Sequence, residues 1–103
     1  MGADDKRKAH QALVDRVVRG PGMTTAQQRK AAFTNADVDP ALQPLLGKVA
    51  TEPTKVTDAD FDQARAAGFT DDQIFEVVIA AAVGQSSRMY ESALAALDEA
   101  AAG

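Results

Sequence analysis

Three polar side chains near the C-terminal end of the chain have the types and spacing of a small binding site. Gln85, Arg88 and Tyr90 directly follow an apolar stretch of a predicted helix, and polar groups in a buried helix need hydrogen-bond partners. Because a guanidinium can hold a carboxylate through two parallel hydrogen bonds, we expect a pocket for a small carboxylate-bearing molecule with Arg88 as its anchor. The alternative is that the helix reaches solvent here and Arg88 pairs with Glu91 at i,i+3 spacing.

Glu76 is a single carboxylate among apolar neighbours. Burial disfavours the charged form of a carboxyl and raises its pKa, which makes Glu76 a candidate acid–base group, with Tyr90 as a second candidate. The alternative is that Glu76 occupies the outer face of its helix. The sequence leaves both interpretations open.

Other chemistries lack the residues they require. The chain has no cysteine and one histidine, His10, which we expect on the surface of a polar helix. Asp58, Asp60 and Asp62 alternate like the start of a calcium loop, but the glycine and glutamate that complete such a loop are missing. These aspartates are better explained as negative charge at a helix N-terminus. We therefore expect no metal site and no cofactor.

Composition and charge narrow the class of protein. The 103 residues are 46% hydrophobic and 25% charged, with a formal net charge of −4, which is typical of a soluble globular domain. Nucleic-acid binders normally carry a basic surface, so we expect no nucleic-acid partner. The longest apolar run falls far short of the roughly 20 residues that span a bilayer. Without a signal peptide, the expected location is the cytoplasm.

Helix-forming residues dominate the chain, because alanine is abundant and β-branched runs are scarce. Breaks fall at the Gly20-Pro21-Gly22 segment and around Pro53, and Thr70 with Gln73 has the form of a capping box. The sequence predicts an all-α fold with one domain over residues 1–103. It should contain about five helices over 3–19, 25–36, 40–51, 58–67 and 71–100.

The last predicted helix is the most distinctive element. Its apolar residues between Ile74 and Val83 cover nearly the whole circumference, which predicts burial on all sides. Ala80, Gly84 and Ser87 lie on one face, and the first two form a small-xxx-small pair that permits close helix approach. The neighbour at this seam is either another helix of the same chain or a second copy.

The C-terminal half of the chain resembles the helical hairpin of the alkylhydroperoxidase-like, or carboxymuconolactone decarboxylase, superfamily. The resemblance covers about residues 42–97. It is carried by Val56-Thr57-Asp58-Ala59-Asp60, by Arg65-Ala66-Ala67-Gly68-Phe69-Thr70-Asp71-Asp72-Gln73-Ile74-Phe75-Glu76-Val77-Val78 and by Ala80-Ala81-Ala82. It implies an alkylhydroperoxidase-like helical bundle whose members commonly form dimers, trimers or hexamers through these helices.

The resemblance does not extend to the catalytic residues. Peroxidases of that superfamily use a CxxC pair with a nearby histidine, and a chain without cysteine cannot perform thiol-dependent peroxide reduction. The decarboxylase branch does not need the CxxC pair, but none of its active-site residues can be matched here. The leading hypothesis is a small structural or binding protein that self-associates through its last helix. The alternative is an enzyme of the decarboxylase type that acts on a small carboxylate-bearing molecule.

Overall fold

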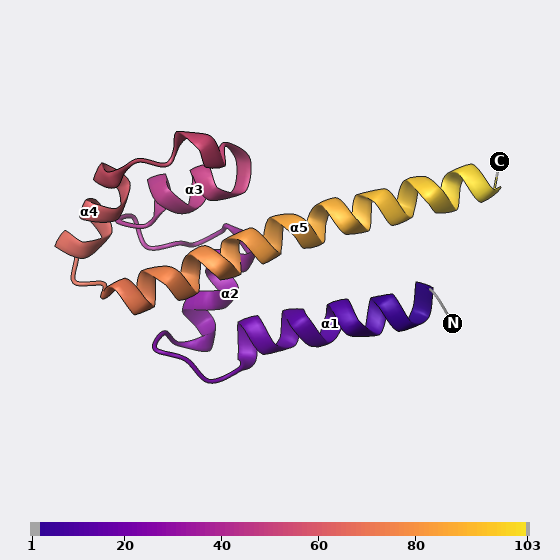
Figure 1. The fold of residues 1–103 in the computed structure, drawn as a ribbon, viewed down its shortest axis with the longest axis horizontal. Helices are drawn as coiled ribbons and strands as arrows, with labels where there is room; N and C mark the ends of the chain where they lie inside the picture. Colours follow the sequence, from indigo (N-terminus) through magenta and orange to yellow (C-terminus); the bar gives the residue numbers. More distant parts are fainter. Residues whose placement is uncertain (1–2, 103) are drawn as a thin grey trace.

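The computed structural model describes residues 3–102, and within this range the chain is all-α, with no strand. The expected set of five helices is confirmed (Figure 1). The helices are α1 (Ala3–Arg19), α2 (Ala26–Thr34), α3 (Gln43–Thr51), α4 (Asp58–Ala66) and α5 (Asp71–Ala102), and a 3₁₀ turn η1 (Pro53–Lys55) lies between α3 and α4.

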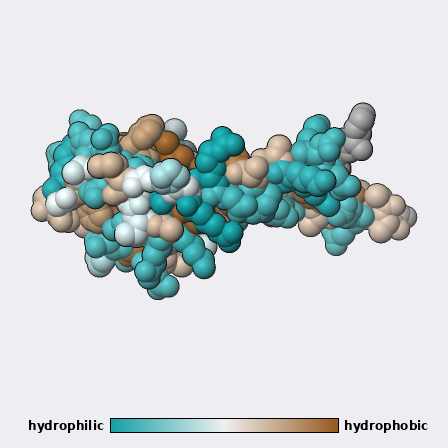
Figure 2. Space-filling model, turned by 90° about the horizontal axis from the view of Figure 1, so that it is seen from below, coloured by the Kyte–Doolittle hydropathy of each residue, from teal (hydrophilic) through white to brown (hydrophobic). Residues whose placement is uncertain are grey.

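The described part of the molecule is elongated, with extents of 51 × 29 × 20 Å. Its radius of gyration of 15.4 Å exceeds the about 13 Å expected for a compact domain of this length. Figure 1 shows α2, α3 and α4 gathered around the first half of α5, while α1 runs antiparallel to α5, from the other end of the molecule toward this region. We call the first region the wide end. The arm is residues 3–11 of α1 with residues 89–102 of α5, and Figure 2 shows it as the narrower end of the molecule.

Capping side chains set several helix boundaries. Thr25 and Gln28 form a capping box at the start of α2, and Thr70 and Gln73 form the predicted one at the start of α5. Asn35 ends α2 in the left-handed conformation, with φ of 55°, which asparagine tolerates better than most residues. The second helix therefore ends at Thr34 rather than at residue 36.

The third helix begins later than the sequence predicts. The predicted range of 40–51 starts this helix at Pro40, but the Asp39 side chain accepts a hydrogen bond from the Ala41 amide and the Asp39 carbonyl accepts one from the Leu42 amide. These bonds close a turn rather than a helix start. The α-helix itself begins at Gln43, with Pro44 in its first turn, where a missing N–H is tolerated.

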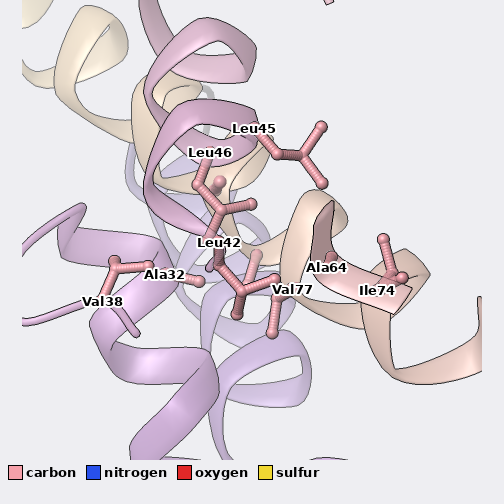
Figure 3. Close-up of a cluster of buried hydrophobic side chains, with 10 residues drawn as sticks. Ala32, Val38, Leu42, Leu45, Leu46, Ala64, Ile74 and Val77 are labelled. Atoms are coloured by element: carbon pink, nitrogen blue, oxygen red, sulfur yellow. The ribbon is translucent and has the colours of Figure 1, made fainter. Parts of the chain in front are cut away.

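The hydrophobic core lies in the wide end, between α2, α3, α4 and α5 (Figure 3). Its largest fully buried side chains are Leu45, Leu46 and Val77. Alanines from three helices fill the rest of the contact surface, so the helices approach closely. The core residues are Ala32, Val38, Leu42, Leu45, Leu46, Ala64, Ile74, Val77, Ala80 and Ala81.

Helix α5 is buried on one face only, which corrects the expectation that it is enclosed on all sides. Phe75 is 65% exposed and Ile79 36% exposed. The reason is that α2, α3 and α4 have nine residues each and pack against the buried residues of α5, so they are too short to enclose it. None of the described helices combines the length and apolar character needed to traverse a bilayer.

Candidate functional site

Glu76 is held by the loop between α1 and α2. Its carboxylate accepts hydrogen bonds from the Met23 amide at 2.6 Å, the Thr24 amide at 2.9 Å and the Thr24 hydroxyl at 2.7 Å. The Met23 and Thr24 bonds, aided by the positive charge of Arg29, lower the pKa of Glu76 below its ordinary value. The expectation of a raised pKa is therefore wrong: these donors stabilise the carboxylate more than burial destabilises it, and Glu76 is a weak base.

Arg29 is a buried cation that the sequence analysis missed. It is 6% exposed, and its guanidinium donates to the carbonyl oxygens of Val17 at 3.1 Å and Gly20 at 2.5 Å. These carbonyls end α1, so Arg29 provides the positive charge that a helix C-terminus favours. In the sequence, Arg29 lies in a polar run with Gln27, Gln28 and Lys30, and nothing in that run distinguishes it.

Gln85 and Arg88 are brought together at the end of α2. The Arg88 guanidinium donates to the Phe33 carbonyl oxygen at 2.8 Å and to the Gln85 side-chain oxygen at 3.1 Å. Both residues line an open groove of about 610 Å³, and Lys48 is also among its lining residues. Arg88 is exposed, so the carboxylate anchor that we expected is a helix-capping cation at the rim of a shallow groove.

Tyr90 lies on another side of α5, beside the only histidine. The rings of His10 and Tyr90 have centroids 4.7 Å apart, and His10 Nε2 lies 3.0 Å from the hydroxyl of Ser87. His10 is half-buried rather than on the open surface. This contact could not be predicted from the sequence, because 77 residues separate His10 from Ser87.

The His10–Ser87 pair lacks the surroundings of a nucleophilic site. Ser87 is 8% exposed and lies in the middle of a continuous helix, where backbone amides are already bonded within the helix and cannot stabilise an oxyanion. His10 and Tyr90 line an open groove of about 490 Å³ between α1 and α5, but Ser87 is not among its lining residues. The pair is best described as a contact that fastens α1 to α5.

The predicted site residues therefore occupy three separate places. Glu76 faces the α1–α2 loop, Gln85 and Arg88 meet the end of α2, and Tyr90 meets α1. Among residues 3–102, no group of three or more histidine, aspartate and glutamate side chains is arranged to hold a metal ion. The structure does not assemble one pocket from the four candidates.

The predicted seam is covered within the chain. Ala80, Gly84 and Ser87 are all buried. A Cβ atom on Gly84 would overlap the backbone of Phe33, so this glycine is what allows α2 to reach α5. Of the two neighbours left open by the sequence, the one at Gly84 is a helix of the same chain, and this face cannot also contact a second copy.

The opposite face of α5 carries a continuous exposed stripe that the sequence analysis did not identify. All eight residues of this stripe are exposed, and Met89 is 64% exposed. At 100° per residue, the stripe centre is directed about 180° away from the core face. The outer stripe consists of Phe75, Ile79, Ala82, Ser86, Met89, Ala93, Ala96 and Ala100.

The spacing of these residues could have revealed the outer stripe. Successive members are four and three residues apart in strict alternation from Phe75 to Ala100, which is the heptad spacing of a helix that packs against another helix. The apolar residues between Ile74 and Val83 hid this pattern, because they were interpreted as one fully buried surface.

No protein-family model, curated protein or solved structure matches the chain.

Proposed function

We propose that this chain is a non-catalytic structural or binding protein that self-associates through the outer stripe of α5. The observation that carries the proposal is the outer stripe itself, which presents small and apolar side chains along most of a 32-residue helix. Monomeric proteins seldom leave a contiguous apolar surface of this kind uncovered. The outer stripe, rather than the seam at Gly84, is thus the surface that we propose for contact with a second copy.

The composition of the outer stripe supports a helix as its partner. None of its eight residues is charged, and four are alanine. Small side chains let two helix backbones approach closely, and alternating large side chains such as Phe75 and Met89 can fill the spaces between the small ones. A second copy of α5 provides these features.

The alternative of an enzyme for a small carboxylate-bearing molecule has less support. Two Arg88 nitrogens already donate to protein oxygens, and three hydrogen bonds hold the Glu76 carboxylate in its charged form. Membership of the alkylhydroperoxidase-like superfamily and a cytoplasmic location remain parts of the proposal that rest on the sequence alone. An oligomer formed through helices is the property that the resemblance and the outer stripe have in common.

Two matched variants test self-association by sedimentation velocity over a range of protein concentrations. Ala93→Glu adds a charge to the outer stripe, whereas Ala95→Glu makes the same change two residues later, on a different side of the helix. Both alanines are exposed, so each variant should keep the helicity of the wild type in circular dichroism. We expect a wild-type oligomer, an unchanged Ala95→Glu oligomer and a monomeric Ala93→Glu variant.

Two results would overturn the proposal. One is a wild-type protein that stays monomeric at every concentration. The other is an Ala93→Glu variant that associates as strongly as wild type, because the added carboxylate would be a buried charge with no partner at the helix pair, which is costly.

A further inference from the structure

The outer stripe has the period of a two-stranded helix pair. Its alternating steps of four and three residues average 3.5 residues per repeat, and sequences with this period wind around each other in a left-handed supercoil. From Phe75 to Ala100 the stripe is about 37 Å long at 1.5 Å per residue. This length and period indicate a continuous pairing with another helix rather than a local contact.

We propose that two copies of α5 pair antiparallel, with Ala82 of one copy opposite Ala93 of the other. This inference rests on the proposed self-association and adds its orientation and register. In that register, Phe75 lies opposite Ala100, Ile79 opposite Ala96, and Ser86 opposite Met89. Every large side chain of the stripe then faces an alanine or a serine.

Side-chain size distinguishes this orientation from the parallel one. In a parallel pair each residue meets its own copy, so Phe75 would meet Phe75 and Ala96 would meet Ala96. One end of such a pair would be crowded and the other end would be loosely filled. Helix interfaces gain most when large and small side chains interdigitate, and the antiparallel register achieves this in every layer except those in which Ala82 faces Ala93.

Size also selects among antiparallel registers. Sliding one helix by one heptad brings Ala82 opposite Ser86, and Ile79 then faces Met89. Two large side chains would meet in that layer, and layers of small residues would remain elsewhere. The register with Ala82 opposite Ala93 pairs all eight stripe residues, and none of its layers holds two large residues.

The flanking positions agree with the antiparallel register. Beside the outer stripe, Glu76 would lie near Leu97 of the other copy, and Glu99 would lie near Val78. Gln85 would lie near Ser92. No two like charges face each other in these positions. Like charges across a helix pair disfavour association.

The remaining helices leave room for this arrangement. The buried residues of α5, which contact the other helices of the wide end, are directed away from the outer stripe, so the wide ends of the two copies point away from the helix pair. The antiparallel orientation places the exposed second half of each α5 against the first half of the other. The arm, which is thin in one copy, is thereby covered in the pair.

Single cysteines test the orientation, and the absence of native cysteine makes the result easy to interpret. Ala82→Cys and Ala93→Cys are prepared separately, one of them with a short tag that changes its mass. The two are then mixed and oxidised with glutathione disulfide. We expect disulfide-linked pairs that contain one copy of each variant, and little linkage when either variant is oxidised alone.

Each other outcome has a defined meaning. Linkage of each variant to itself, with no mixed pairs, would overturn the antiparallel orientation. Linkage of Ala82→Cys to Ser86→Cys in place of Ala93→Cys would overturn the register. A wild-type protein that is monomeric in sedimentation would overturn the proposed function itself, and this measurement is independent of the cysteine variants.

Discussion

In the wide end, the first half of α5 packs against α2, α3 and α4, whereas in the arm its second half lies beside α1. The wide end contains the hydrophobic core and also the buried Asp60, whose carboxylate accepts hydrogen bonds from Lys48. The arm has no residue in that core cluster, and its residues after Tyr90 are almost all exposed. The first half of α5 is therefore stabilised by packing against other helices. Its second half is stabilised mainly by the helix propensity of its residues, which include alanines at 93, 95, 96 and 100.

The largest effect should come from closing the space between α5 and α2. Gly84→Ala places a Cβ atom against the Phe33 backbone, which has no flexible atoms to yield. We expect the free energy of unfolding, measured by urea denaturation, to fall by about 3 kcal/mol, the upper part of the range for overpacked sites.

Gly47→Ala is the matched control. This glycine also lies in a helix, but a Cβ atom there would meet nothing within 4 Å. Replacing a helical glycine by alanine where space is available raises stability by up to about 1 kcal/mol. Equal effects of the two variants would show that the wide end does not depend on the contact at Gly84.

A smaller effect is expected from the carboxylate that connects α5 to the α1–α2 loop. Glu76→Gln removes the charge that accepts three hydrogen bonds, and hydrogen bonds to charged groups contribute about 1.5–3 kcal/mol each. Because glutamine keeps one acceptor oxygen, we expect a loss of about 2 kcal/mol at pH 7. Glu91→Gln, at an exposed position of the same helix, should change stability by less than about 0.5 kcal/mol.

The pH dependence of the stability difference between wild type and Glu76→Gln gives a second test of these hydrogen bonds. Since the folded-state pKa of Glu76 is lowered, its stabilising effect is complete above the ordinary glutamate pKa of about 4.3 and is lost as pH falls through the lower folded-state value. The stability difference between wild type and Glu76→Gln should therefore shrink on acidification below about pH 4. A difference that stays constant to low pH would contradict the assigned hydrogen bonds.

The smallest effect should be confined to the arm. His10→Ala removes the hydrogen bond to Ser87 and the ring contact with Tyr90, and a net contribution of about 1 kcal/mol is typical of one such bond. Amide hydrogen exchange should accelerate in α1 and stay unchanged in the core of the wide end. Lys8→Ala, at an exposed position of α1, is the control, and equal acceleration in both variants would show that His10 does not fasten the arm.

Local features of the fold could be predicted from the sequence because they depend on neighbouring residues. The cap formed by Thr70 with Gln73 was predicted from its spacing, and the cap formed by Thr25 with Gln28 has the same spacing. The start of α3 was misplaced because the Asp39 side chain bonds to a turn instead of a helix. The caps and the start of α3 both depend on hydrogen bonds between residues two or three positions apart in the sequence.

The candidate sites depended on contacts between distant parts of the chain, which the sequence did not reveal. The donors to Glu76 are more than 50 residues away, and so is the carbonyl that Arg88 caps. A glutamate among apolar residues looks the same whether amides, solvent or a substrate satisfy it. The outer stripe differs, because its heptad spacing is visible in the sequence, and only its exposure required the structure.

The hydrogen bonds of Arg29 fix the C-terminal end of α1 as the point about which this helix can tilt. The guanidinium holds the carbonyls of Val17 and Gly20, so the C-terminal end of α1 is immobilised while its other end lies about 25 Å away at 1.5 Å per residue. A tilt of α1 by about 10° about its C-terminal end would displace its N-terminal end by about 4 Å at 1.5 Å per residue. The contacts of His10 with Ser87 and Tyr90 restrain this tilt at a point between the two ends. Small rotations of α1 would thus open or close the groove along α5 and leave the wide end unchanged.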